Sequence, residues 1–246
     1  MKEHSNKHRD LVYTIKNRCR VCYTCVRECP AKAIKIINGQ AEVINDRCIG
    51  CGNCIKVCSQ DAKAFLDTKQ RFYNLLKSDK KNIAIIAPSF PAEFSDITNY
   101  RLFVSKIRQL GFDVVSEVAF GADLVAQRYN ELVSSNGNKR FISSDCPAIV
   151  SYIEKYHPEL VNNLAPIASP MVAMARVMKR KYGEDNNIIF IGPCIAKKSE
   201  SEEVDEMLTF RELREVFEEN KMYSNQLEPT DFDPPYSGRG AIFPVS

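Results

Sequence analysis

The sequence lacks several features, and each absence excludes a class of protein. It has no tryptophan and only three histidines among 246 residues, so histidine-rich zinc or di-iron sites are not expected. Its longest apolar runs, such as residues 83–87, are far shorter than the roughly 20 residues that a transmembrane helix needs. Its 34 basic and 31 acidic residues leave a net charge of only +3, which argues against nucleic acid as the main partner.

The N-terminal residues, MKEHSNKHRDLVY, contain no apolar segment of the kind found in secretory signals. We therefore expect a cytoplasmic location. Ten cysteines in a cytoplasmic chain need an explanation, because disulfides are disfavoured in a reducing compartment. Metal binding or redox chemistry is the leading interpretation.

Eight of the ten cysteines form two quartets with the same spacing, C-x2-C-x2-C-x3-C. The quartets are Cys19, Cys22, Cys25 and Cys29, and Cys48, Cys51, Cys54 and Cys58. The second quartet follows the first by 29 positions throughout, which indicates an internal repeat. This is the spacing of bacterial two-cluster ferredoxins.

In that arrangement three closely spaced thiolates surround one 4Fe–4S cubane, and the fourth cysteine of the quartet reaches the other cluster. We therefore predict two crossed ligand sets: Cys19, Cys22, Cys25 and Cys58 for the first cluster, and Cys48, Cys51, Cys54 and Cys29 for the second. Between the quartets, two short strand patterns flank Asn38–Gly39, a typical hairpin turn. A pair of zinc sites is the alternative, but zinc usually takes two C-x2-C pairs set well apart.

The sequence pattern predicts two domains joined by a linker. Residues 9–68 resemble a bacterial-type ferredoxin, which implies an α+β fold with two low-potential clusters that pass single electrons. We place this ferredoxin-like domain at 1–68 and a polar linker at 69–81. Over 82–246, apolar strands alternate with amphipathic helices, which predicts an α/β domain with a mostly parallel sheet. The expected strands are 83–87, 113–118, 140–143, 187–191 and 204–208, and the expected helices lie within 94–110, 121–135, 147–156, 169–183 and 210–220.

Three of the predicted strands lead into a proline, at Pro88, Pro147 and Pro193. Ligand sites in open parallel sheets gather beyond the carboxyl ends of the strands, and the two remaining cysteines, Cys146 and Cys194, lie there. Pro147 suits the first turn of a helix, whose backbone dipoles would favour a thiolate at Cys146. The alternative is two separate buried thiols.

The chain as a whole resembles the catalytic subunit of iron-only (FeFe) hydrogenases. The resemblance rests on PCIAKKSE at 193–200, which meets a P-C-x2-K-x2-E signature, on SSDCP at 143–147 and on APSF at 87–90. Such a subunit is an oxidoreductase of anaerobic metabolism, and its active site joins a cubane to a di-iron unit that carries CO and cyanide.

The resemblance also implies roles for individual residues of this sequence. Cys146 and Cys194 would ligate the cubane of that active site. Lys197 and Ser89 would each donate a hydrogen bond to a cyanide, and Glu200 would pair with or orient the lysine.

The sequence departs from the family pattern in three places. Asp145 stands where the family has a proton-donating cysteine; a carboxyl group has a reference pKa near 3.9, against about 8.5 for a thiol, so Asp145 would be a poor donor near neutrality unless burial raised its pKa. The glutamates of the family's proton path are not matched, because Gly121 and Leu124 stand there. The last signature, with two further cysteines, is not met before Ser246, and two cysteines cannot complete a cubane.

We therefore expect an iron–sulfur electron-transfer protein of the FeFe-hydrogenase family, a sensory or otherwise divergent member whose full active site needs residues beyond 246. Turnover by this incomplete hydrogenase-like domain alone is not expected. The alternative is a non-catalytic electron-transfer or scaffold protein that holds the ferredoxin clusters only. A third interpretation makes the second domain a partner-binding module that signals the redox state of the clusters.

The expected cofactors are two 4Fe–4S clusters, with a third 4Fe–4S cluster and a di-iron CO/cyanide unit in the complete protein. The expected partners are a redox protein, either a ferredoxin or an oxidoreductase, and H2 and protons in a catalytic member. Neither nucleic acid binding nor membrane insertion is expected.

Overall fold

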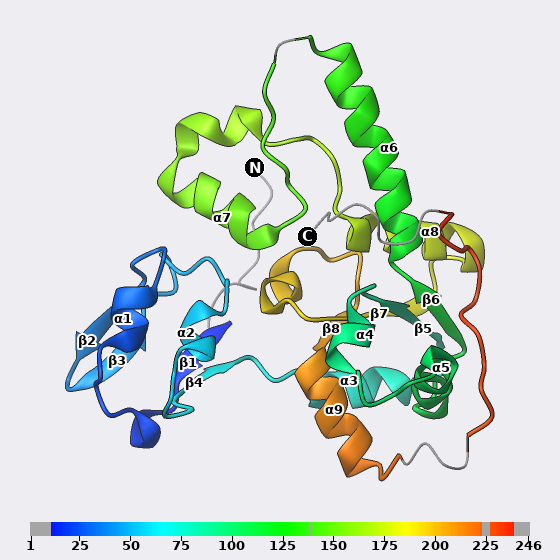
Figure 1. Cartoon of the computed structure of the whole chain (residues 1–246), viewed down its shortest axis with the longest axis horizontal. Coiled ribbons are helices and arrows are strands. Elements are labelled where there is room, and N and C mark those ends of the chain that lie inside the picture. Colours follow the sequence, from blue (N-terminus) through cyan, green and yellow to red (C-terminus); the bar gives the residue numbers. More distant parts are fainter. Residues whose placement is uncertain (1–10, 138, 223–226, 239–246) are drawn as a thin grey trace. The chain divides into compact units, whose positions relative to one another are not determined.

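The structure, a computed structural model, describes residues 11–137, 139–222 and 227–238 (Figure 1). The chain forms two compact units, each built from several segments. Unit 1 contains Met1–Asp67, Cys146–Leu164 and Cys194–Glu200, and unit 2 contains Thr68–Asp145, Ala165–Pro193 and Ser201–Ser246. This division differs from the domain ranges predicted above, because two segments from beyond residue 82 belong with the cysteine quartets.

The described part of the first segment of unit 1 contains two small antiparallel sheets and three short helices. Strand β2 (Ile34–Ile37) pairs with β3 (Gln40–Val43), and β1 (Val12–Thr14) pairs with β4 (Lys63–Phe65). The turn between β2 and β3 lies at Asn38 and Gly39, which both have positive φ angles, so the predicted hairpin is confirmed. The short helices are η1 (Lys16–Arg18), α1 (Thr24–Glu28) and α2 (Asn53–Lys56).

The 29-residue repeat of the sequence is also a repeat of backbone conformation. Positive φ angles occur at Val21, Tyr23 and Lys32, and again 29 positions later at Gly50, Gly52 and Asp61. The same shift relates the pair β2–β3 to the pair β4–β1. Each C-x2-C-x2-C loop therefore curls in the same way, with left-handed residues at the same points between its cysteines.

The second segment of unit 1 holds helix α7 (Pro147–Tyr156) and the turn η2 (Pro158–Asn163), and the third holds η3 (Ile195–Ser199). The end of α7 is attached by hydrogen bonds to the residues around the quartets. The Tyr156 hydroxyl donates to the carbonyl oxygens of Ala31 and Arg47, at 2.6 and 3.0 Å. The Lys155 ammonium donates to the carbonyl oxygen of Cys48 at 2.6 Å. Apolar side chains of α7 and η3 also pack against the core of this unit.

Unit 2 is built on a four-stranded sheet in the order β6-β5-β7-β8. Every neighbouring pair is parallel, so the predicted parallel sheet is confirmed. The two central strands are buried along almost their whole length, because helices cover both faces of such a sheet. The strands are β5 (Lys81–Ile86), β6 (Val114–Glu117), β7 (Asn186–Gly192) and β8 (Glu206–Thr209).

Within the described residues, helices α3, α5, α8 and α9 contact this sheet. Helix α8 packs against β5 and β7, α5 against β6, and α3 and α9 against β7 and β8. Figure 1 shows α6 as the long helix that leaves the end of β6. None of the helices in the described part of the chain is long and apolar enough to cross a membrane. The helices of unit 2 are α3 (Lys69–Leu76), α4 (Phe90–Glu93), α5 (Tyr100–Gln109), α6 (Ala119–Ser135), α8 (Pro170–Tyr182) and α9 (Phe210–Glu219).

The predicted strand at 140–143 is wrong. Ile142 forms only an isolated bridge, in which its carbonyl oxygen accepts from the Ala165 amide at 2.9 Å. Phe141 and Ile142 are half-buried and Arg140 is exposed, so the segment lacks the continuous apolar character of the buried strands. Cys146 therefore lies at the start of a helix and does not follow a strand.

Candidate metal centres

The first predicted ligand set gathers around the buried Cys25. Burial is the largest cause of the raised pKa of this thiol, and the Lys63 ammonium opposes it. The thiols of Cys58, Cys22 and Cys19 raise the same pKa further. These three thiols are the other members of the first set, so the fold brings them into the electrostatic environment of Cys25.

The second set gathers in the same way around the buried Cys54. Burial raises the pKa of this thiol to about 12, although the Lys63 ammonium opposes the shift. The thiols of Cys48, Cys51 and Cys29 add to it. In both sets, therefore, the buried thiol has as its neighbours two cysteines of its own loop and one cysteine from the other quartet.

Backbone amides point at three of the sulfur atoms. The Ala33 amide donates to Cys29 Sγ at 3.2 Å, and the Ala62 amide, 29 positions later, donates to Cys58 Sγ at 3.3 Å. The Gly50 amide donates to Cys48 Sγ at 3.4 Å. Amide donors favour the thiolate over the thiol and tune clusters bound to it. The chain thus places amide donors at three of the predicted cluster ligands.

The residues of each set fit a 4Fe–4S cluster better than a single ion. A mostly apolar cavity is lined by Cys29, Cys48, Cys51 and Cys54, the four members of the second set. Within 11–137, 139–222 and 227–238, no three cysteine, histidine or carboxylate side chains stand as close as one metal ion requires. A cubane is larger than one ion and takes one thiolate at each iron, which suits four thiols around a shared space.

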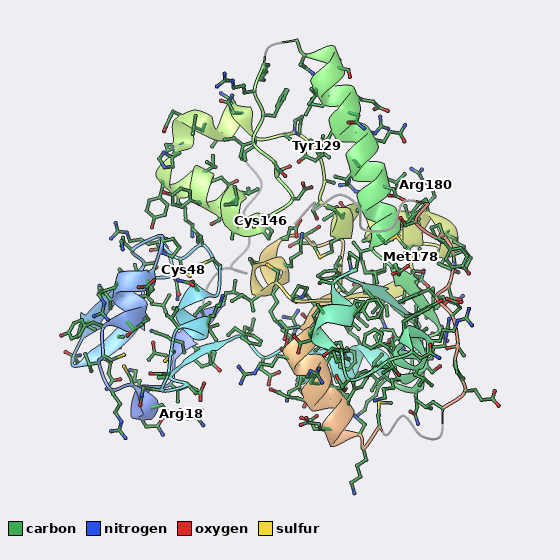
Figure 2. All side chains as sticks on the ribbon, viewed as in Figure 1. Arg18, Cys48, Tyr129, Cys146, Met178 and Arg180 are labelled. Atoms are coloured by element: carbon green, nitrogen blue, oxygen red, sulfur yellow. The ribbon has the colours of Figure 1, made fainter. Side chains whose placement is uncertain are left out.

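Cys146 and Cys194 come together within unit 1. Burial raises the pKa of the Cys194 thiol, and the backbone amides of Ala196 and Lys197 oppose the shift. The Cys146 thiol raises it further, so the two sulfurs interact although 47 residues separate them in the sequence. Each cysteine immediately precedes a helical segment, Cys146 before α7 (Figure 2) and Cys194 before η3.

The loop of the second quartet packs directly on η3. A Cβ atom on Gly52 would lie 3.2 Å from Cδ1 of Ile195, the residue that follows Cys194. A Cβ atom on Gly50 would lie 3.4 Å from Cβ of Ala196. The second ligand set and Cys194 are therefore neighbours across a close contact.

Lys197 and Glu200 form a shielded ion pair in the same segment. The Lys197 ammonium lies 2.6 Å from Oε2 of Glu200, and the two side chains are only 14% and 13% exposed. The carboxylate therefore orients the lysine, as the family resemblance implies. The pair lies one helical turn beyond Cys194.

Asp145 and Ser89, the other two predicted site residues, belong to unit 2. Asp145 is 5% exposed, and its Oδ2 accepts from the Ser143 hydroxyl at 2.6 Å. The hydroxyl of Tyr129, on α6 (Figure 2), lies 3.2 Å from the same serine oxygen. Asp145 therefore ends a short chain of hydroxyl groups. Ser89 is exposed and precedes the single turn of α4.

The absence of a glutamate at position 121 has a steric cause. Gly121 lies where α6 crosses α8, and a Cβ atom there would be 2.4 Å from the carbonyl oxygen of Pro170 and 3.1 Å from Cβ of Met174. No side chain fits at this crossing. A groove of about 640 Å³ beside it, lined by α6 and α8, includes Leu124 and contains no cysteine.

Lys63 is a residue of the site that the motif search missed. It is 5% exposed, and its ammonium opposes the raised pKa of one thiol in each ligand set, Cys25 and Cys54. The repeat contains the signal that would have identified it. Position 34, 29 residues earlier, holds isoleucine, so a lysine replaces an apolar residue in the second copy.

Comparison with known proteins agrees with this architecture. Residues 80–246 match the family model described as iron only hydrogenase large subunit, C-terminal domain. Residues 11–59 match a 4Fe-4S dicluster domain, so the N-terminal part binds 4Fe–4S clusters. Iron hydrogenase 1 of Clostridium pasteurianum is 31% identical over an alignment 277 residues long. The alignment covers 93% of this chain and 48% of that protein. The cytosolic Fe-S cluster assembly factor NAR1 of Yarrowia lipolytica is 24% identical over 46% of this chain and 25% of its own length.

Solved structures show the same fold. An FeFe-hydrogenase whose structure reveals stepwise H-cluster assembly is 26% identical, with a TM-score of 0.57 over 69% of this chain and 51% of that one. A variant of the hydrogenase HydA1 from Chlamydomonas reinhardtii is 24% identical, with a TM-score of 0.58 over 69% and 51%. This chain spans less than half the length of the curated relatives it matches. By its match over residues 80–246, the chain belongs to the iron-only hydrogenase large-subunit family.

Proposed function

We propose that this protein is an iron–sulfur electron-transfer protein in which two 4Fe–4S clusters deliver electrons to a site at Cys146 and Cys194. The observation that carries the proposal is the grouping of the thiols. Cys25 and Cys54 each interact with the members of their own crossed set. A bound cubane supplies reversible one-electron reduction, and the chain supplies its anionic ligands and their amide donors.

The contacts of the second quartet support the direction of transfer. Its loop touches Ile195 and Ala196, which directly follow Cys194. In the loop of the first quartet, by contrast, Tyr23 is half exposed. We therefore propose that electrons enter at the first cluster and leave through the second towards Cys194. The proposed donor is a redox protein, a ferredoxin or an oxidoreductase, and the proposed location is the cytoplasm.

We further propose a third centre at Cys146 and Cys194. The two sulfurs interact, but a cubane takes four protein ligands, so this centre needs further ligands in addition to these two cysteines. A di-iron unit with CO and cyanide would supply the hydrogen chemistry of the complete site. Lys197, held by Glu200, would donate to one cyanide, and Ser89 to another.

Two features favour a slow or sensory member over an efficient hydrogenase. Asp145 stands in place of a thiol proton donor of the family, so a carboxyl group would have to supply the proton there. Gly121 leaves no space for a glutamate of the proton path, because α6 and α8 touch there. We expect the complete protein to turn over hydrogen more slowly than members that keep both groups.

Anaerobic reconstitution of residues 1–246 tests the electron-transfer function. We expect about eight irons and eight inorganic sulfides per chain, because two 4Fe–4S clusters fill the two sets. Electron paramagnetic resonance of the reduced protein should show two interacting clusters. A double variant, Cys146→Ala with Cys194→Ala, is the matched control and should retain the same iron. One zinc ion per quartet, or no bound metal, would contradict the proposal.

A non-catalytic electron-transfer or scaffold protein is the second candidate function. The similarity to proteins named as cytosolic Fe-S cluster assembly factors supports it, as does Asp145 in the donor position. Maturation of a chain extended beyond 246 with the di-iron unit separates the two candidates. Infrared bands of CO and cyanide, together with slow hydrogen uptake, support a divergent hydrogenase. A matured protein without those bands and without uptake supports the scaffold.

A further inference from the structure

The two halves of the repeat differ at one buried cross-strand pair. In the sheet β2–β3, Ile34 pairs with Val43. In the sheet β1–β4, Lys63 pairs with Thr14. The 29-residue repeat makes Lys63 equivalent to Ile34 and Thr14 equivalent to Val43. One half therefore has an apolar pair where the other has a lysine and a threonine. The change involves both members of the pair.

Lys63 is buried without an acidic partner in the part of the chain that the structure describes. Its ammonium donates to Thr14 Oγ1 and to the carbonyl oxygen of Ala41, both at 2.5 Å. Both acceptors are uncharged, so they solvate the ammonium without neutralising it. Burial of a charge without a counter-charge is unfavourable. The isoleucine at the equivalent position 34 shows that this fold accepts an apolar residue there.

A counter-charge is available on both sides of Lys63. After burial, the Lys63 ammonium is the largest influence on the pKa of Cys25, and it is likewise the largest on the pKa of Cys54. These thiols belong to different ligand sets. A cubane held by four thiolates is an anion, and its negative charge increases when it takes up an electron. Strand β4, which holds Lys63, contacts α2, which holds Cys54, and the amide of Ala62, the residue before Lys63, donates to Cys58 Sγ of the first set. The ammonium is therefore within electrostatic reach of both ligand sets.

We propose that Lys63 is a shared tuning residue whose buried ammonium stabilises the reduced state of both 4Fe–4S clusters and raises both reduction potentials. This inference rests on the proposed function, since it requires the two clusters. Each cluster accepts one electron from a low-potential donor protein, and no bond forms or breaks. Lys63 acts through the charge of its ammonium group. Thr14 is a positioning residue, because its hydroxyl holds the ammonium in place.

The size of the effect follows from the surroundings. A charge acts more strongly across a buried, apolar region than across water. Because one cation serves two clusters, its removal should shift both potentials in the same direction. An exposed lysine of the same unit should have little influence, since water and salt screen it.

The test is a redox titration of reconstituted residues 1–246, followed by electron paramagnetic resonance, on the variant Lys63→Ile. Isoleucine is the residue that the repeat itself places at position 34. Both midpoint potentials should become more negative, and the equilibrium constant for reduction of each cluster should fall at least tenfold, which is about 59 mV for a one-electron couple. Lys63→Arg, which keeps the charge, should retain potentials close to those of the wild type. Lys35→Ile, at an exposed position of β2, is the matched control and should leave both potentials unchanged.

The double variant Lys63→Ile with Thr14→Val restores the apolar pair, and Lys63→Met provides an unbranched alternative of similar length. Unchanged potentials in a fully loaded Lys63→Ile or Lys63→Met protein would overturn the inference. A shift confined to one cluster would overturn the shared role. Loss of iron from all three apolar variants, with full iron in Lys63→Arg, would assign Lys63 to cluster assembly and overturn its role in tuning. Loss of clusters from the wild type itself would instead overturn the proposed function.

Discussion

The two cysteine loops of unit 1 have the same backbone conformation but obtain it with different residues. The first loop holds its positive φ angles with Val21 and Tyr23, and the second with Gly50 and Gly52. Tyr23 is half exposed, so its side chain has room. In the second loop a Cβ atom on Gly50 would lie 2.8 Å from Leu11 Cδ2. Close neighbours as well as the backbone conformation therefore favour glycine in the second loop.

This comparison shows how a repeat becomes asymmetric. Left-handed backbone costs a residue with a side chain about 1–2 kcal/mol, and the first loop has this conformation at Val21 and Tyr23. The second loop has glycine at both positions, Gly50 and Gly52, and lies in close contact with η3 next to Cys194. One half of the repeat can then face solvent and a donor while the other adjoins the Cys194 segment.

The strongest test of the comparison removes one ligand at a time. Cys22→Ala and Cys58→Ala should each lose about four irons and leave the same remaining cluster, because both residues belong to the first set. Cys51→Ala and Cys29→Ala should leave the other cluster. Iron analysis with the midpoint potential of the remaining cluster measures this. If Cys58→Ala instead matched Cys51→Ala, the crossed assignment would be wrong.

A smaller effect should follow from exchange of the loop residues. Gly50→Val places in the second loop the residue that stands at position 21, and we expect it to lower the free energy of unfolding by about 2–3 kcal/mol through overpacking and left-handed strain. The reciprocal variant Val21→Gly should change stability by less than about 1 kcal/mol. Thermal unfolding of the reconstituted proteins measures both. Equal losses would show that the contact with Leu11 and η3 does not distinguish the loops.

The smallest effect concerns the attachment of α7. Tyr156→Phe removes the hydroxyl that donates to the carbonyl oxygens of Ala31 and Arg47. We expect it to lower the free energy of unfolding by about 1 kcal/mol. Hydrogen exchange of the α7 amides should accelerate accordingly. Tyr152→Phe is the control, since its ring stacks on that of Tyr156 and its hydroxyl makes no hydrogen bond to any described residue. If the two variants responded identically, the Tyr156 hydroxyl would not contribute to the attachment of α7.

Local patterns predicted much of the fold. The Asn38–Gly39 hairpin, the helices that begin at Pro147 and Pro170, and the parallel sheet all formed, because turn residues, helix-start prolines and apolar periodicity act over a few residues. The strand predicted at 140–143 did not form, since a short apolar run does not determine whether a neighbouring strand is available for pairing. The placement of α7 and η3 with the quartets depends on contacts of Tyr156 and Ile195, which have no distinctive sequence pattern.

The sequence by itself determined the ligand chemistry of this protein: two cysteine quartets at a fixed spacing, repeated after 29 residues. Spacing is sufficient there because a cubane is bound largely by one short loop. Only the tertiary structure brings Cys146 within electrostatic range of Cys194, and Lys63 within electrostatic range of a thiol in each ligand set. Those relations join residues far apart in the chain, and they arise from burial and packing of whole elements, which no local spacing encodes.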